Sequence, residues 1–158
     1  MDQKQQQQQE QQQEQRRIYI DGIWDLFHSG HVLHLKELKE LDGQCNFLIV
    51  GIISDKNASL YKRPPIYSEQ DRKILIQSCK YVDQVVEDAP LIVNQQFMKD
   101  HQIDLVCHGF SNDQDFEKQS QFFKVPIKLN KFRKVQYHHG ISTTNIIQKI
   151  QQLVLNPP

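Results

Sequence analysis

The chain has 158 residues, with 19 basic and 19 acidic side chains and therefore no formal net charge. This length suffices for one domain with a buried core, and a neutral chain offers no general attraction for nucleic acid or an anionic membrane. Its three cysteines form no CxxC pair, which argues against a zinc cage or disulfide framework and favours a reducing, cytoplasmic setting. We expect neither a signal peptide nor a transmembrane segment, because no apolar run approaches the roughly 20 residues that a membrane span needs.

Residues 1–15 are almost entirely glutamine with scattered glutamate. Such a tract cannot bury apolar surface, so we expect a disordered tail. The tail is either an interaction segment or an extension without a role. The remaining residues, 16–155, are expected to form a single domain.

From residue 17 onward, apolar runs alternate with amphipathic stretches. The expected strands are 17–21, 47–53, 82–86, 104–109 and 125–129, the last at a sheet edge because Pro126 cannot donate a ladder hydrogen bond. The expected helices are 31–41, 68–80, 91–100, a short one from Asp113, and 140–153. A loop or broken helix, stiffened by prolines at its end, covers 55–65.

Two of these helices carry a predicted inward face. Ser68 is expected to cap the helix 68–80, with Ile74, Leu75 and Cys79 turned inward. The last helix is expected to turn Ile146, Ile147 and Ile150 toward the core.

Strands that alternate with helices at this spacing predict a doubly wound, parallel, Rossmann-like α/β sheet. Ligands bind such sheets at the carboxyl ends of the strands, near the topological switch point. Three stretches fall at that edge: 21–31, the pair His108 and Gly109, and 140–144. The site is therefore expected there.

The run His28-Ser29-Gly30-His31 follows a strand and opens a helix. A helix start presents outward N–H groups and a positive dipole end, which suits polyphosphate. Gly30 lets the backbone approach a ligand oxygen, and imidazoles can donate to a phosphate whose charge grows during transfer. Ordinary turn histidines are the alternative, but the pair in this context favours a phosphate site.

Two further elements could hold phosphate. Lys62, on the stiff loop, can bind as a point charge, although a solvated surface lysine is the alternative. The run Ile141-Ser142-Thr143-Thr144 opens a helix, where hydroxyls and N–H groups could hold β- and γ-phosphates. Capping by Ser142 is compatible with that role.

No nucleophile motif, Walker A motif or GxGxxG is present. A direct in-line displacement needs none, because a substrate phosphate oxygen can attack the α-phosphate of a nucleoside triphosphate while pyrophosphate leaves. Catalysis is then positioning and charge stabilisation, helped by Mg²⁺ on the phosphates. The adjacent His138 and His139 point apart and are not expected to bind a metal.

The sequence resembles the HxGH cytidylyltransferases of phospholipid synthesis over about residues 17–152. Its matching stretches are 21–31, 61–65, 68–72, 81–86, 104–109 and 140–144. The resemblance implies transfer of CMP from CTP to phosphoethanolamine, phosphocholine or glycerol phosphate, by a homodimer. An adenylyltransferase that shares HxGH is a further alternative.

The resemblance also implies residue roles. His28, His31 and Lys62 are the expected catalytic residues, and Lys62 touches both substrates. The other expected CTP contacts are Ile23, Trp24, Gly30, His108, Gly109, Gly140, Ile141, Ser142 and Thr143. The expected phospho-alcohol contacts are Asp21, Lys62, Leu91 and Phe116.

The head group is harder to choose. The run 21–31 resembles the phosphocholine enzymes, but Leu91 stands where they place a tryptophan, and Phe116 is matched to a later tyrosine of their cation site. Quaternary ammonium recognition relies on aromatic rings. The runs 62–65 and 105–109 resemble the phosphoethanolamine enzymes, which we favour, although those enzymes usually carry two such domains.

One departure concerns Tyr137, which stands where the family has a phosphate-binding arginine. Losing such a contact can cost about 10²–10³ in rate. The second domain of the two-domain phosphoethanolamine enzymes also lacks this arginine. A catalytically weak or silent regulatory domain is therefore the rival prediction.

Overall fold

The structure is a computed structural model that describes residues 15–136 and 140–156. Almost all of the tail expected to be disordered lies outside these residues. So do Tyr137, His138 and His139.

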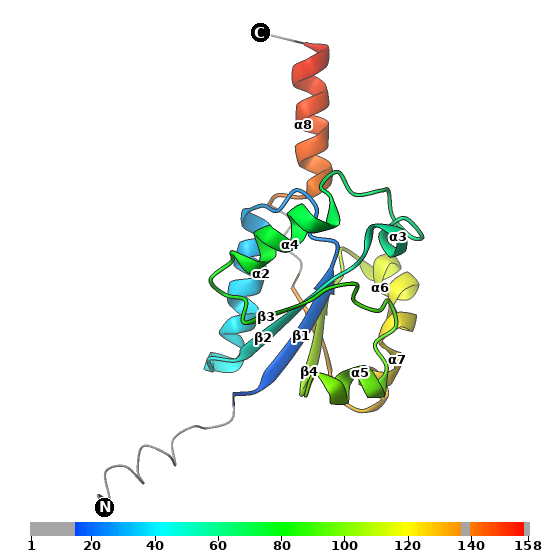
Figure 1. Ribbon diagram of the computed structural model, residues 1–158. Helices are drawn as coiled ribbons and strands as arrows, with labels where there is room; N and C mark the ends of the chain where they lie inside the picture. The colour runs from blue at the N-terminus through cyan, green and yellow to red at the C-terminus, as the bar shows by residue number, and fades with distance from the viewer. Residues whose placement is uncertain (1–14, 137–139, 157–158) are drawn as a thin grey trace, which may run out of the picture.

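The centre of the molecule is a five-stranded parallel sheet (Figure 1). Strands β1 (Arg17–Gly22), β2 (Phe47–Ile52), β3 (Gln84–Val86), β4 (Leu105–Gly109) and β5 (Phe132–Val135) lie in the order β3-β2-β1-β4-β5. The winding direction changes between β1 and β4, which pair directly. The predicted doubly wound α/β fold is confirmed, with its switch point beside the end of β1.

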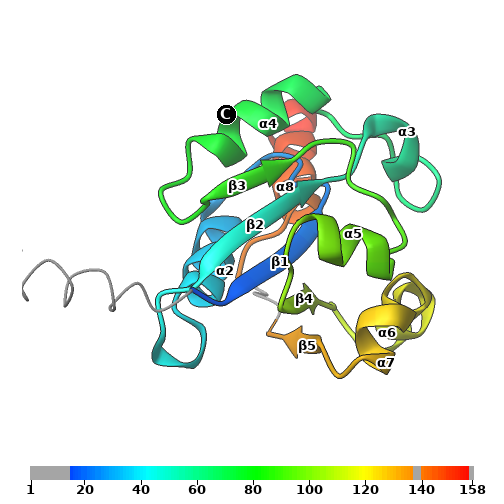
Figure 2. The same cartoon turned by 60° about the horizontal axis from the view of Figure 1, so that its bottom comes forward.

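Helices cover both faces of the sheet (Figure 2). Helices α2 (Ser29–Lys39) and α4 (Glu69–Gln77) lie on one side, with the 3₁₀ turn η1 (Leu41–Gly43) after α2. Helices α5 (Gln95–Asp100), α6 (Asp113–Gln119) and α7 (Lys124–Lys128), with the 3₁₀ turn η2 (Ser120–Phe123), lie on the other. The short α3 (Asp55–Ala58) and the long α8 (Thr143–Leu155) lie at the carboxyl edge.

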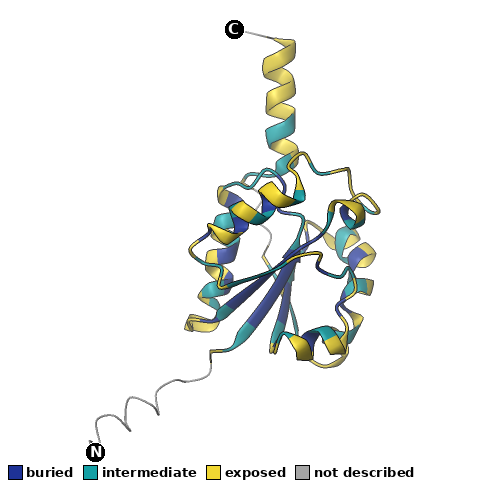
Figure 3. Cartoon of the chain, viewed as in Figure 1, coloured by how far each residue is buried: buried dark blue, intermediate teal, exposed yellow. Residues whose placement is uncertain are grey.

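Alternation along the strands builds a core on each face, because successive side chains of a strand point to opposite sides. Ile18 and Ile20 of β1 pack with the α2 and α4 side chains. Tyr19, between them, packs with Met98 of α5 and Phe123 of η2. These central strand residues are fully buried (Figure 3), as expected for a parallel sheet covered on both faces.

The predicted strand 125–129 is wrong. This segment is helix α7, and the fifth strand is Phe132–Val135. Pro126 lies in the first turn of α7, where its missing N–H needs no partner. The run 132–135 instead forms the strand that pairs with β4.

Two predicted helix faces also need correction. Ile74 is 50% exposed, whereas Arg72 and Ile76 are the buried side chains of α4. Helix α8 has no buried residue, and its Ile150 is 51% exposed. The helix starts at the sheet edge and then runs away from the body, so only its first turns meet the domain (Figure 1).

Some element ends also shift. Helix α2 begins two residues earlier than predicted, at Ser29, and α5 begins only at Gln95 with Asn94 as its cap. Ser68 does cap α4, accepting from the Asp71 N–H at 3.1 Å. Among the described residues, no helix has both the length and the apolar character that a membrane crossing requires.

Candidate active site

The turn between β1 and α2 holds two histidines that cap the helix with their own rings. Nδ1 of His28 accepts from the Gly30 N–H at 3.1 Å, and Nδ1 of His31 accepts from the His28 N–H at 3.3 Å. The two rings stack with centroids 3.8 Å apart. Because each Nδ1 is an acceptor, each neutral ring carries its proton on Nε2. The backbone therefore makes both side chains donors toward a ligand.

Both imidazoles resist protonation. Burial is the main cause that lowers the pKa of His31 to about 3, with the neighbouring His28 and His34 adding to it. Burial also lowers the pKa of His28. At neutral pH the pair is uncharged, so its contribution to an anion site is made through hydrogen bonds.

Trp24 fixes the path of the same turn. Its backbone has a φ of 59°, and its buried indole donates from Nε1 to the Gly51 carbonyl at 2.9 Å. A Cβ at Gly22 would lie 2.9 Å from the indole ring, so only glycine leaves room for it there. The indole ties the turn to strand β2.

Asp25 joins three segments of the site. Its carboxylate accepts from the N–H groups of Ile66 and Tyr67, each at 2.9 Å, and from Arg63 at 3.0 Å. Its carbonyl accepts from the Thr143 hydroxyl at 2.9 Å, at the start of α8. Burial alone would raise the pKa of Asp25, but these donors outweigh burial and lower it. The ionised carboxylate thus holds the loop that carries Lys62 against the turn.

A buried arginine also stabilises the strand ends next to this turn. Arg72 of α4 is fully buried and donates to the Ile53 carbonyl at 2.9 Å and to the Ile23 carbonyl. It also pairs with Asp55 at 2.6 Å. These contacts clamp the carboxyl ends of β1 and β2 together.

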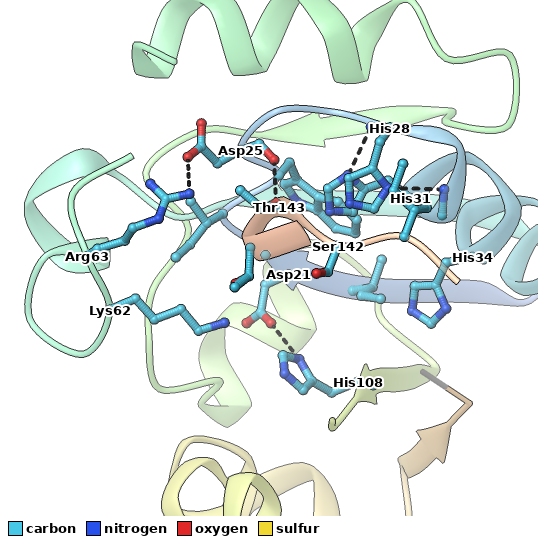
Figure 4. Close-up of a pocket in the computed structure, with 18 residues that line it drawn as sticks. Asp21, Asp25, His28, His31, His34, Lys62, Arg63, His108, Ser142 and Thr143 are labelled. Atoms are coloured by element: carbon cyan, nitrogen blue, oxygen red, sulfur yellow. Dashed lines mark hydrogen bonds and ion pairs between the residues drawn. The ribbon is translucent and has the colours of Figure 1, made fainter. Parts of the chain in front are cut away.

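Asp21 and His108 meet across the switch point. Asp21 and His108 each lie one residue before the end of their strand, β1 and β4, and Nδ1 of His108 is 3.1 Å from Oδ1 of Asp21. A cavity of about 460 Å³ opens above them (Figure 4). Lys62 reaches toward Asp21 from one end of this cavity, and His34 lies at the other. A second cavity of about 40 Å³ shares the walls formed by Asp21, Lys62 and His108.

Most of the predicted site residues converge on the larger cavity. Its lining includes Asp21, Ile23, Trp24, His28, Gly30, His31, Lys62, His108, Gly109, Ile141, Ser142 and Thr143. Leu91 lines the smaller cavity, near the predicted head-group residues Asp21 and Lys62.

Two predicted residues lie elsewhere. Gly140 is exposed and lines neither cavity. Phe116 packs edge-on against Phe110 and also lines neither. The aromatic side chains at the smaller cavity are instead Tyr61, Phe122 and Phe123.

Several residues that line the two cavities were not among the predicted site residues. Asp25, His34 and Arg63 line the larger cavity, and Gln119 lines the smaller one. His34 lies one helical turn after His31, so helix periodicity could have flagged it. Gln119 lay in a polar run whose periodicity gave no sign of burial.

The described residues contain no cluster of three or more His, Cys, Asp or Glu side chains able to hold a metal ion. The two aspartates at the cavity already have partners in His108 and Arg63.

Comparisons with known proteins identify the family of the chain. Residues 19–149 match the family model described as Cytidylyltransferase-like. The chain is 37% identical over 136 residues to choline-phosphate cytidylyltransferase A of Homo sapiens, covering 85% of this chain and 36% of that protein. It is also 37% identical over 139 residues to the ethanolamine-phosphate cytidylyltransferase of Arabidopsis thaliana, covering 85% of this chain and 32% of that protein. The chain thus spans about a third of the length of these relatives.

Among solved structures, the lipopolysaccharide core biosynthesis protein from Thermoplasma volcanium is similar. It superposes with a TM-score of 0.59 at 26% identity, covering 78% of this chain and 98% of that one. Because the family model spans most of the described fold, from β1 into α8, this chain belongs to the cytidylyltransferase-like family.

Proposed function

We propose that this chain transfers CMP from CTP to phosphoethanolamine, giving CDP-ethanolamine and pyrophosphate. One observation carries the proposal: two Nε2 donors, the Lys62 ammonium and the start of α8 all line one cavity at the switch point. Relatives named for phosphocholine and for phosphoethanolamine support the reaction class equally.

The triphosphate lies along the β1–α2 turn. His28 and His31 donate from Nε2 to its oxygens, and their neutral rings keep these donors at physiological pH. The start of α8 offers backbone N–H groups to the terminal phosphates. The Thr143 hydroxyl already donates to the Asp25 carbonyl and the Ser142 hydroxyl accepts from Asn145, so these side chains position the helix end.

In the reaction, a phosphate oxygen of phosphoethanolamine attacks the α-phosphorus of CTP. The bond from that phosphorus to the bridging oxygen breaks, and pyrophosphate leaves in line with the attack. Lys62 stands between the two cavities and can neutralise both phosphates as they approach. Magnesium bound to the triphosphate supplies further charge neutralisation.

The smaller cavity favours ethanolamine as the head group. Its volume is about 40 Å³, against about 460 Å³ for the larger cavity. Ethyl-ammonium has half as many heavy atoms as the ethyl-trimethylammonium of choline, so the small cavity suits it better. Leu91 supplies no aromatic face where the phosphocholine enzymes place a tryptophan, although Tyr61, Phe122 and Phe123 also line this cavity.

A pyrophosphate-release assay tests the proposal. Purified protein receives CTP with phosphoethanolamine, phosphocholine or glycerol 3-phosphate, and ATP replaces CTP in a parallel series. We expect turnover to be fastest with CTP and phosphoethanolamine. Pyrophosphate release no faster than that of a His31→Asn variant would refute the proposal, and faster turnover with phosphocholine would reassign the head group.

A silent CTP-binding domain is the second candidate, favoured by Tyr137 in place of the family arginine. Tyr137 lies outside the described residues. Calorimetric binding of CTP without turnover, together with turnover gained by Tyr137→Arg, would support this candidate.

We also propose the homodimer that the family resemblance implies. Light scattering in the same buffer tests this oligomeric state.

A further inference from the structure

The smaller cavity contains one polar side chain that neither the nucleotide nor the phosphate contacts explain. Gln119, at the end of α6, is 7% exposed and lies against the same cavity as Asp21 and Tyr61. A buried amide costs free energy unless its donors and acceptor find partners. A ligand that carries N–H groups into this cavity would give the amide oxygen a further partner.

Neighbouring residues set the orientation of this amide. Its Nε2 donates to Oδ1 of Asp115. Oδ2 of Asp115 in turn accepts from the Ser111 N–H at 2.9 Å and from the Ser111 hydroxyl at 3.1 Å. Since Nε2 is committed to Asp115, the carbonyl Oε1 is the amide atom left to accept from a ligand in the cavity.

Two further acceptors lie on the same wall. Asp21 adds a buried carboxylate and Tyr61 a phenol oxygen, while Leu91 and Phe122 close the apolar part. Lys62 and His108 line this cavity where it adjoins the larger one. A primary ammonium has three N–H donors to place on such a wall. A trimethylammonium has none, so it would leave the acceptors without hydrogen bonds. A site built to bond an N–H group rejects an analogue that lacks it far more strongly than an apolar pocket rejects a methyl group.

We propose that Gln119 is a specificity-determining residue, which accepts a hydrogen bond from the primary ammonium of the phospho-alcohol and selects it over methylated amines. This inference rests on the proposed function, because it takes the smaller cavity as the head-group end of that site. Gln119 binds the cation, and the reacting phosphates lie in the larger cavity.

A methylation series on the wild-type chain tests the inference without any variant. Dissociation constants are measured by calorimetry, in the presence of CTP, for phosphoethanolamine and its N-methyl, N,N-dimethyl and N,N,N-trimethyl derivatives. We expect the affinity to fall along the series, by about tenfold or more from first to last, as N–H donors are lost. Equal affinity along the series, or tighter binding of the trimethyl compound, overturns the inference.

A matched pair of variants assigns the effect to the residue. Gln119→Met keeps the side-chain length and removes the acceptor. Gln121→Met makes the same change at an exposed site, whose amide donates to the Lys118 carbonyl. We expect Gln119→Met to weaken phosphoethanolamine about tenfold, to change phosphocholine less than twofold and to leave CTP affinity unchanged, while Gln121→Met matches the wild type.

The outcomes separate this inference from the proposed function. Graded binding along the methyl series that Gln119→Met abolishes, without turnover in the wild type, would overturn the proposed activity and support the role of Gln119. Turnover whose head-group preference is the same in Gln119→Met would overturn only the role of Gln119. If Gln119→Met fails to fold, Gln119→Leu takes its place in the same comparison, and an unchanged preference overturns the role of Gln119.

Discussion

The pH dependence of folding stability gives a sharp test of the buried histidine pair. In the unfolded chain His31 takes up a proton below its ordinary pKa of 6.5, whereas in the folded protein burial delays this to a pKa of about 3. Between these values the unfolded state binds more protons, so the free energy of unfolding falls as the pH drops through that window. Above pH 6.5 neither state binds the proton, and His31 adds no slope.

The size of the effect follows from the two pKa values. At about 1.4 kcal/mol per pKa unit, the difference between 6.5 and about 3 corresponds to at most about 4–5 kcal/mol by pH 3. Such a loss is a large fraction of the total stability of a domain this size. The effect is therefore measurable by urea unfolding at each pH from 7.5 to about 4.

His31→Asn is the matched perturbation. The Asn side-chain oxygen can replace Nδ1 as acceptor for the His28 N–H, but the side chain does not titrate and has no counterpart of Nε2. We expect the free energy of unfolding to depend less on pH between 6.5 and 4 than in the wild type. The same substitution at His101, which lines neither cavity, controls for the loss of an imidazole as such.

Kinetics on the same variant complete the test. Loss of the Nε2 donor is expected to lower kcat by about 10²–10³, at every pH where the protein is folded. Parallel pH profiles of stability for the wild type and His31→Asn would refute the reasoning, because they would mean that His31 titrates in the folded protein as it does in water.

Four further predictions concern other residues of the site and the sheet. Lys62→Met should raise KM about 10–100-fold for both CTP and the phospho-alcohol, and an effect on only one substrate would contradict its place between the cavities. Asp25→Ala leaves two backbone N–H groups and a guanidinium without their acceptor, so urea unfolding should show a loss of about 2–3 kcal/mol; unchanged stability would contradict its role as a clamp. The Tyr19 hydroxyl is buried without a hydrogen-bond partner among the described residues, so Tyr19→Phe should raise the midpoint of thermal unfolding or leave it unchanged. A Cβ at Gly51 would collide with that hydroxyl, so Gly51→Ala should lower the free energy of unfolding by about 1–3 kcal/mol. A double-mutant cycle should show a smaller loss in the Tyr19→Phe background.

Local sequence signals predicted the edge where the site lies. The strand, the short turn and the helix start around His28 and His31 form a local structure. Its side chains point outward at the carboxyl end of the strand, independently of the elements that surround it. The parallel order of the strands then brings His108 to Asp21, because neighbouring parallel strands end at the same edge. The residues alone left Lys62 open between a phosphate contact and a solvated lysine, and the family resemblance favoured the phosphate contact. Its place in the cavity depends on contacts of the loop with Asp25.

Segments of weak or mixed periodicity were predicted less well. The run 125–129 is apolar and short, and such runs do not distinguish a strand from a helix. Phe116 and Phe123 are both phenylalanines in the same polar stretch, and only packing decided that Phe123 lies at the smaller cavity. Helix α8 has an apolar stripe that pattern alone would bury, but its direction away from the sheet leaves the stripe exposed.

The sequence by itself determined the strand-helix alternation, the capping histidines and the family, because each is encoded in residues close together along the chain. Only the tertiary structure decided which distant side chains share a cavity. The contacts of Asp25 with the loop 63–67 and of Arg72 with two strand ends join residues far apart in sequence, and so does the smaller cavity that Gln119 lines with Asp21. Such contacts depend on how whole elements pack, and no local pattern specifies that packing.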